Sequence, residues 1–298
     1  MRYKPTWIGI LAGLMLTSAG CSSTANTAAI KGTQGTITQN PTPDNIQAAP
    51  IIRLVGASTP YPAMQLLSNT YELKANNIQI AFLDSSQSSG GIAAVKSGLA
   101  EIGTVTRPPK PEESSRDLSY REIAKDALLV AVHQSVKGIN DLTTQDLKAI
   151  YSGQVTNWKV FGGPDAEIIV LDRAEDTSAK RLLRKHYLGD SLKNSPNSIL
   201  LRREADLVEA LQNTPHSIGV VSLAKTTSEN LSVNIITLDG IAPNAENLKS
   251  NRYVMHRTLG IVWYGTPSNT SQEFIDFILS ETSSNILSQS GFVPSFTD

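Results

Sequence analysis

The stretch IIRLVGASTPYPAMQLL, residues 51–67, decides the class of fold. It opens with a short apolar run, 51–56, of the kind that forms a buried strand. A loop of small and hydroxyl-bearing residues follows, and then Pro60 and Pro62 open a helix, because proline is tolerated in the first helical turn. The stretch therefore predicts a strand, a polar loop and a helix in direct succession.

The same unit recurs along the chain. Further strands are predicted at 77–83, 101–105, 127–133, 166–171, 217–223 and 233–238, and further helices around 92–99, 144–151, 177–187 and 271–287. Strands separated by helices are typical of an α/β protein, with parallel strands that helices cover on both faces. Ligands of such proteins bind at the carboxyl ends of the strands, so the loops that follow strands are where a site is expected.

Four of these loops have similar chemistry. They are GASTPYP (56–62), SSQSSGG (85–91), TVTR (104–107) and RAEDTSAK (173–180). Three of them lead into a helix, whose first turn offers unpaired N–H groups and the positive end of the helix dipole. Each loop alone is read first as an ordinary helix cap, and each arginine alone could as well be a surface ion-pair partner. Together the four loops predict a site for a tetrahedral oxyanion, which accepts hydrogen bonds on every side.

The N-terminus has the order of an export signal. Arg2 and Lys4 precede an apolar run at 7–16, and small residues at 18–20 lead to Cys21. The run is shorter than the ~20 apolar residues that span a bilayer, although a membrane anchor helix is the alternative. We expect residues 1–20 to be a signal peptide.

Cys21 is the only cysteine, so it forms no intramolecular disulfide and no cysteine metal cluster. Its position resembles the lipobox of bacterial lipoproteins, which implies lipidation of Cys21; ordinary cleavage that releases a soluble protein is the alternative. Residues 21–50 are rich in Thr, Ser, Asn, Gln and Ala and show no periodicity. They are expected to be a disordered tether.

Composition excludes several classes of function. The net charge is −1, with 26 basic and 27 acidic residues and no basic stripe, which argues against nucleic acid as a partner. The four histidines are scattered, no Cys/His cluster has metal spacing, and no Gly-x-Ser-x-Gly elbow is present. We therefore expect neither a metal, nor a cofactor, nor an enzyme.

Several motifs resemble one family in their order along the chain. They are SSGG (88–91), AEIG (100–103), LTTQDLKAIYSGQVTNW (142–158), SIGVVSL (217–223), YVMHR (253–257) and GFVP (291–294). This order resembles the phosphate-binding proteins of bacterial high-affinity phosphate ABC transporters, within the type II periplasmic binding protein superfamily. The resemblance implies an α/β, two-lobed type II periplasmic binding protein fold, with two mixed sheets flanked by helices around a hinge.

The resemblance also implies domain limits and a function. Lobe one would be 51–133 plus 254–298 and lobe two 134–253, with a hinge near His133 and Tyr253. The chain would be an extracytoplasmic solute-binding lipoprotein, monomeric and held on the periplasmic side of the cell envelope by Cys21. It would capture phosphate or a similar oxyanion between its lobes for an ABC permease in the inner membrane.

Carried over residue by residue, the resemblance implies a set of anion contacts. They are Ser58, Thr59, Tyr61, Ser88, Thr106, Arg107, Arg173, Thr177, Ser178 and Ala179. Thr106 replaces an aspartate of well-known members, and Thr177-Ser178-Ala179 stands where the family usually has Ser-Gly-Thr. These departures leave two alternatives open, a binding protein for another oxyanion and a ligand-free sensor or interaction protein of the cell envelope.

Overall fold

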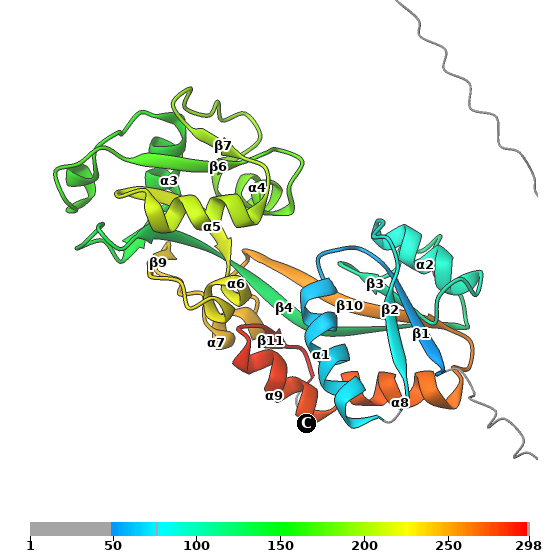
Figure 1. The fold of residues 1–298 in the computed structure, drawn as a ribbon. Coiled ribbons are helices and arrows are strands. Elements are labelled where there is room, and N and C mark those ends of the chain that lie inside the picture. Colours follow the sequence, from blue (N-terminus) through cyan, green and yellow to red (C-terminus); the bar gives the residue numbers. More distant parts are fainter. Residues whose placement is uncertain (1–48, 76, 297–298) are drawn as a thin grey trace, which may run out of the picture. The chain divides into compact units, whose positions relative to one another are not determined.

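The computed structural model of the protein describes residues 49–75 and 77–296 (Figure 1). The predicted signal peptide, Cys21 and all but the end of the predicted tether lie outside the described residues. The described residues belong to one compact unit, Ala48–Asp298. Within them, no helix is both long enough and apolar enough to cross a membrane.

One part of the sheet is built on the predicted strand–loop–helix unit. β1 (Ile51–Gly56) pairs in parallel with β2 (Gln79–Phe82) and β3 (Ile102–Val105). β10 (His256–Tyr264) lies antiparallel between β3 and β4 (Leu118–His133). The other elements of this part are α1 (Tyr61–Lys74), α2 (Ser88–Lys96), α8 (Asn269–Ile278), α9 (Glu281–Gln289) and β11 (Val293–Pro294), which pairs with β4.

A second part of the sheet continues on the other side of β4. β8 (Ser217–Ser222) pairs antiparallel with β4 and parallel with β6 (Ile169–Arg173), which pairs with β7 (Ile199–Leu201). β9 (Val233–Leu238) pairs with β4 and with β5 (Asp141–Leu142). The helical elements are α3 (Thr144–Ser152), the 3₁₀ turn η1 (Trp158–Phe161), α4 (Ser178–Leu183), the π-helical turn η2 (Arg184–Leu188), α5 (Glu204–Asn213), α6 (Leu223–Ser228) and α7 (Ala245–Lys249).

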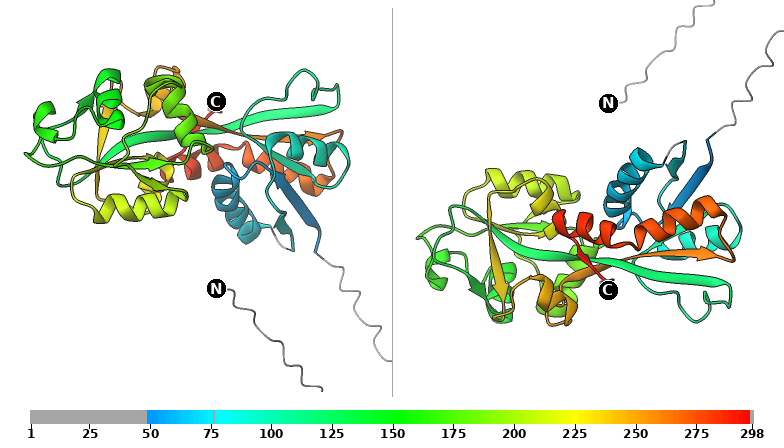
Figure 2. Two further views of the ribbon diagram at one scale, coloured as in Figure 1. Left: turned by 90° about the horizontal axis from the view of Figure 1, so that it is seen from above. Right: turned by 90° about the horizontal axis from the view of Figure 1, so that it is seen from below.

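β4 belongs to both parts (Figures 1 and 2). Its residues 118–127 pair with β10, and its residues 128–133 pair with β8 and β9. Ala124 packs into one hydrophobic core and Ala127 into another, so the strand passes between two cores within a few residues. The expected two-lobed α/β fold with mixed sheets and flanking helices is confirmed.

The two cores follow from the sequence pattern. In the first, Met64 and Leu67 of α1 pack with Leu54 of β1 and with Phe274 and Ile278 of α8. In the second, buried residues of β4 pack against α3, η1 and α5, with Tyr151 and Trp158 fully buried. The helices thus turn apolar residues toward the two cores, as amphipathic helices require.

Three predicted elements differ from the structure. Leu99 lies beyond the end of α2 and is exposed, because the chain turns at Gly98, whose φ of +72° favours glycine. The helix predicted over 271–287 is two helices, because Ser280 caps the start of α9 through the N–H of Ser283. The helix predicted over 177–187 continues from α4 into the π-helical turn η2.

Candidate anion-binding site

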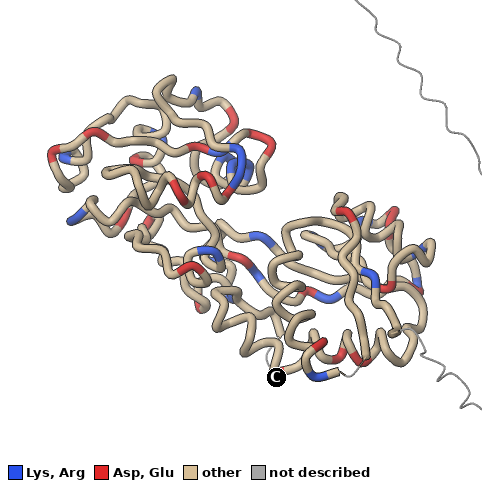
Figure 3. The backbone as a smooth tube through the Cα atoms, viewed as in Figure 1, with Lys and Arg blue, Asp and Glu red and all other residues tan. Residues whose placement is uncertain are grey.

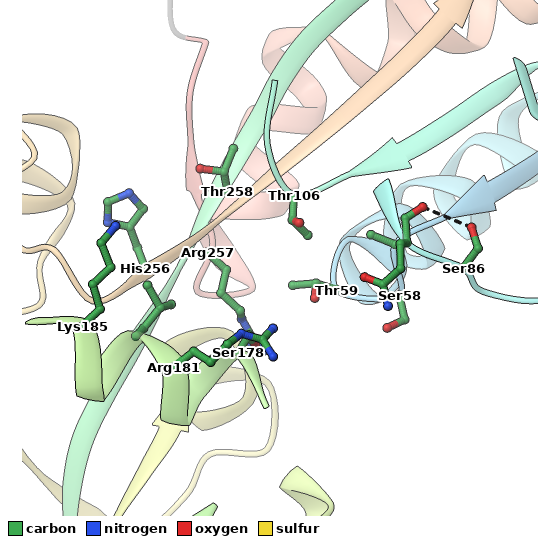
Figure 4. Close-up of a pocket in the computed structure, with 13 residues that line it drawn as sticks. Ser58, Thr59, Ser86, Thr106, Ser178, Arg181, Lys185, His256, Arg257 and Thr258 are labelled. Carbon is green, nitrogen blue, oxygen red and sulfur yellow. Dashed lines mark hydrogen bonds between the residues drawn. The ribbon is translucent and has the colours of Figure 1, made fainter. Parts of the chain in front are cut away.

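A cleft of about 620 Å³ is lined by loops from both parts of the sheet that β4 joins (Figure 4). Among the residues that the structure describes, its lining includes hydroxyl, amide and cationic side chains and no aspartate or glutamate. The lining residues are Ala57, Ser58, Thr59, Ser86, Gln87, Thr106, Ser178, Arg181, Leu182, Lys185, His256, Arg257 and Thr258. Such a lining suits an anion, since it offers donors and positive charge without a competing carboxylate.

The first predicted loop supplies Ser58 and Thr59 to the cleft. α1 begins directly after them, with Pro60 at its N-cap and no side-chain cap, so its first N–H groups are not capped by a side chain. Tyr61 does not line the cleft. Its hydroxyl donates to the carbonyl oxygen of Leu83 at 2.9 Å, and its ring packs edge-on against Phe82.

The second loop contributes Ser86 and Gln87, while Ser88 lies buried one layer behind. The backbone N–H of Thr106 donates to the Ser88 hydroxyl at 3.0 Å, and the two hydroxyl oxygens are 3.2 Å apart. Ser88 therefore touches Thr106 of the third loop, and it is Thr106 that reaches the cleft wall. The two loops are held together at the point where they meet the cleft.

Glycines bring α2 to this position. A Cβ at Gly91 would lie 3.0 Å from the Cα of Gly56 and from the backbone oxygens of Val55 and Thr104. A Cβ at Gly103 would lie 2.7 Å from the Gly91 oxygen. The helix therefore packs against the ends of β1 and β3 with backbone in contact with backbone, which only glycine permits.

Arg107 turns away from the cleft. Its guanidinium donates twice to Glu113, at 2.6 and 2.8 Å, and once to the hydroxyl of Ser89 at 3.0 Å. The hydrogen bonds from Arg107, with those from Ser89 and the backbone of Lys110, hold the pKa of Glu113 well below its usual range. Arg107 is not among the residues that line the cleft, and its contact with the anion stays a prediction.

Of the fourth loop, Ser178 alone lines the cleft among the residues predicted there. Thr177 caps α4: its hydroxyl oxygen accepts from the N–H of Lys180 at 3.3 Å and donates to the Ala174 carbonyl at 2.8 Å. Ala179 is buried in the core. Thr177 and Ala179 therefore fix the shape of the loop, and Ser178 between them reaches the edge of the cleft.

Arg173 lies behind the cleft at the end of β6. One Nη donates to the carbonyl of Arg202 at 2.9 Å, and its Nε is buried without a partner among the described residues. Burial, more than any nearby charge, lowers its pKa. The preceding residue, Asp172, forms a fully buried ion pair with Lys180 at 2.6 Å, which ties the end of β6 to α4.

The floor of the cleft comes from the start of β10, which the four predicted loops do not include. His256, Arg257 and Thr258 lie there. Arg257 is held by Asp126 of β4, which both its Nε and an Nη contact, and Ser222 donates to the same carboxylate at 2.8 Å. Burial lowers the pKa of His256 below its ordinary value.

α4 and η2 supply two more residues that the loops do not predict, Arg181 and Lys185. A signal for them exists in the sequence. Ser178, Arg181 and Lys185 stand at i, i+3 and i+7, which places them on one helical face. For Arg257 the motif YVMHR (253–257) marks the segment but not its place in the cleft, which β10 reaches only through its pairing with β3 and β4.

No group of three or more His, Cys, Asp or Glu side chains suited to a metal ion occurs in residues 49–75 and 77–296. The cleft therefore offers hydrogen-bond donors and positive charge as its means of recognition. Such a set can hold a tetrahedral oxyanion without any metal, provided that donors from both sides converge on it.

Comparisons with known proteins identify the family. Residues 23–282 match a family described as the PBP superfamily domain. The chain is 28% identical over 252 residues to the phosphate-binding protein PstS of Borreliella burgdorferi, covering 82% of this chain and 89% of that one. It is 24% identical over 211 residues to PstS of Bacillus subtilis, covering 70% and 68%.

Solved structures show the same similarity. A putative phosphate ABC transporter substrate-binding protein from Clostridium perfringens, with bound phosphate, superposes with a TM-score of 0.65 at 26% identity. The alignment covers 82% of this chain and 99% of that one. PstS from Borrelia burgdorferi gives a TM-score of 0.58 at 26% identity, covering 83% and 100%.

Proposed function

The chain belongs to the PBP superfamily, and from this premise we propose that it captures inorganic phosphate between its two lobes for an ABC importer. The main support for this proposal is that hydroxyl-bearing loops from both parts of the sheet line one cleft. Ser58, Thr59 and Thr106 approach from the side of β1 and β3, and Ser178 from the side of β6.

The relatives support phosphate over other ligands. The similar chains from Borreliella and Bacillus are phosphate-binding proteins, and the similar Clostridium structure holds phosphate. An oxyanion that meets hydroxyl groups on both lobes bridges them and favours their closed arrangement, because the bound state makes contacts that the open state lacks. The closed protein would then be the form that a permease recognises.

We extend the proposal to the ends of the chain and to the lobes. Cys21 would be lipidated after removal of residues 1–20, and 21–50 would tether a monomeric binding unit to a membrane on the periplasmic side of the cell envelope. The lobes would divide at 133/134 and 253/254. The order of charge, apolar run and small residues before Cys21 supports the first statement, and the passage of β4 from one hydrophobic core to the other supports two lobes.

We propose no catalysis and no cofactor. Within the described residues, the cleft side chains that could act as acids or bases are His256 and Lys185, and no hydrogen bond joins either of them to a serine or threonine that it could activate. Binding and release of an unchanged ligand is the chemistry that the donors support.

Calorimetric titration tests the proposal. The tag-free protein is unfolded in denaturant, dialysed to remove bound ligand, refolded and titrated with phosphate, sulfate and molybdate. We expect saturable binding of phosphate at one site. A refolded protein with native circular dichroism that binds none of the three would overturn the proposal in favour of a ligand-free interaction protein.

One observation favours the alternative that the protein binds another oxyanion. Thr106 puts a neutral hydroxyl at the cleft wall where the family is expected to carry aspartate. Phosphate keeps a proton at neutral pH and sulfate does not, so a carboxylate there repels sulfate more strongly, and its absence weakens that discrimination.

Thr106→Asp should therefore weaken sulfate binding by about tenfold or more relative to phosphate, at ~1.4 kcal/mol per decade. Thr106→Val is the matched control, since it removes the hydroxyl without adding charge. Calorimetry with both anions at fixed ionic strength measures the ratio. If wild-type protein already ignores millimolar sulfate while binding phosphate, the neutral side chain at 106 has no part in selectivity.

A further inference from the structure

The cleft wall formed by α4 and η2 carries more positive charge than one bound phosphate would need. Four cations lie within the short segment 180–185 on α4 and η2, seen as a cluster of blue in Figure 3. Lys180 and Arg184 are neutralised by Asp172 and Glu175, at 2.6 Å in both cases. Arg181 and Lys185 are exposed and line the cleft.

Arg181 and Lys185 have no such counter-charge. Among the described residues no carboxylate lies within 4.0 Å of either, and the one protein acceptor that Arg181 contacts is the backbone carbonyl of Asp176. The cations that face the protein are therefore paired, while those that face the cleft are not. A positive charge without a partner at a cleft wall favours an anion supplied from outside.

These charges lie beyond the hydroxyl groups along α4. Arg181 follows Ser178 by three residues, a rise of ~4.5 Å along a helix, and Lys185 is a further turn away. Figure 4 shows Lys185 beside His256 of β10, at the opposite end of the labelled residues from Ser58 and Ser86. One oxyanion bound between Ser178 and Ser58 therefore leaves the far end of the cleft unengaged.

His256 completes this end of the cleft. Its Nδ1 lies 3.2 Å from the backbone oxygen of Tyr253, and a proton on Nδ1 that is donated to this oxygen leaves Nε2 as the ring atom available to a ligand. A bound anion favours the protonated ring, in which Nε2 is also a donor. Arg257, in contrast, is already held by Asp126 and lies between the two ends. The far end of the cleft thus combines a guanidinium, an ammonium and an imidazole.

We propose that Arg181, Lys185 and His256 form a second anionic subsite, so that the cleft accepts compounds in which a phosphate or phosphonate group is joined by a short link to a second phosphate or a carboxylate. This proposal rests on the proposed function, since the first anionic group occupies the hydroxyl end of the cleft. It extends the ligand class from inorganic phosphate to small phosphorylated or phosphonate dianions.

A matched pair of ligands tests the subsite. Methylphosphonate carries one anionic group, and phosphonoacetate adds a carboxylate to the same phosphonate. We expect phosphonoacetate to bind about tenfold more tightly, or ~1.4 kcal/mol, in calorimetric titrations at fixed ionic strength. Inorganic phosphate is titrated in parallel as the probe of the proposed function, and pyrophosphate as a second compound with two anionic groups.

The double variant R181A/K185A should remove most of the advantage of phosphonoacetate over methylphosphonate. Lys137→Ala removes an exposed lysine that does not line the cleft and serves as the matched control. The measured quantity is the ratio of the two affinities. Because phosphonoacetate carries one more negative charge than methylphosphonate, Arg116→Ala is added to the control, so that K137A/R116A loses the same charge as R181A/K185A from exposed residues outside the cleft.

The outcomes separate the two proposals. A protein that binds phosphate but prefers phosphonoacetate no more than methylphosphonate has no second subsite. An advantage that survives in R181A/K185A also overturns the subsite, because the two cations then do not recognise the second anionic group. A protein that binds none of these anions contradicts the proposed function itself.

Discussion

Arg107 and Arg173 show how one residue type acquires two roles from its surroundings. Both follow strands in hydroxyl-rich loops, and both are expected from the sequence to contact the anion. Arg107 engages Glu113 with both ends of its guanidinium, whereas Arg173 keeps a buried Nε with no partner among the described residues. A buried donor without a partner costs ~1–3 kcal/mol, so an oxyanion oxygen that reaches it on closure is stabilising.

Arg173→Ala should weaken phosphate binding by about tenfold to a hundredfold, because a charge-assisted hydrogen bond contributes ~1.5–3 kcal/mol. Arg121→Ala is the control, since Arg121 is exposed and contacts only the neighbouring carbonyl of Tyr120. Calorimetry measures both variants. Equal affinities in wild type and Arg173→Ala would remove Arg173 from the site.

The pair of Arg107 and Glu113 predicts a dependence of stability on pH. Hydrogen bonds from Arg107 and Ser89 lower the folded pKa of Glu113 below its unfolded value of about 4.5. The pair therefore stabilises the fold above that unfolded value, and its contribution is lost as the pH falls toward the lower folded value. Arg107→Ala should lower the urea midpoint at pH 7, and the difference from wild type should shrink at pH 3. A difference that stays constant between the two pH values contradicts this account.

At the scale of the element, the position of α2 decides where the second and third loops end. Gly91 allows its backbone to touch the ends of β1 and β3, and Ser88 at its start then meets Thr106. The predicted polar loop is thus positioned by a backbone contact in the middle of the helix. The glycines of SSGG contribute to the site through packing as much as through flexibility.

Gly91→Val should displace α2 and destabilise the protein, because the added Cβ alone would lie 3.0 Å from three backbone atoms that cannot move independently. We expect a loss of ~1–3 kcal/mol in the free energy of unfolding, with weaker phosphate binding. Ala93→Val lies on the exposed face of the same helix and is the control for helix propensity. Urea unfolding of the two variants is compared; similar losses would show that propensity and not packing is responsible.

At the scale of the whole molecule, β4 passes from one hydrophobic core to the other, and Arg257 is fixed beside this crossing by Asp126. The cleft opens at the same place, since its lining includes residues from both parts and from the start of β10. A ligand that bridges the two sides should therefore change the arrangement of the lobes by bending near the crossing.

Saturating phosphate should lower the radius of gyration measured by small-angle X-ray scattering, because the closed arrangement is more compact. It should also stabilise the fold by ~2.7 kcal/mol at a hundred times the dissociation constant. Arg173→Ala, at a phosphate concentration that saturates wild type but not the variant, should retain the larger radius. Calorimetric saturation with unchanged scattering would show that binding does not require closure.

The sequence alone predicts the local parts of this protein. The strand at 51–56, the helix with Met64 and Leu67 buried, and the polar loops that follow strands all depend on short-range rules of spacing and capping. Ser58, Thr59, Thr106 and Ser178 come from those loops and line the cleft. The order of motifs also predicts the family, to which residues 23–282 belong.

Only the tertiary structure decides which side chains face the ligand space. Tyr61 and Arg107 stand in the predicted loops, yet one donates to Leu83 and the other pairs with Glu113. Arg257 enters from β10, whose place between β3 and β4 depends on pairing between segments far apart in the chain. Local spacing determines which residues are near a loop, but the direction of a side chain depends on the partners that the folded chain brings to it, and those partners are long-range.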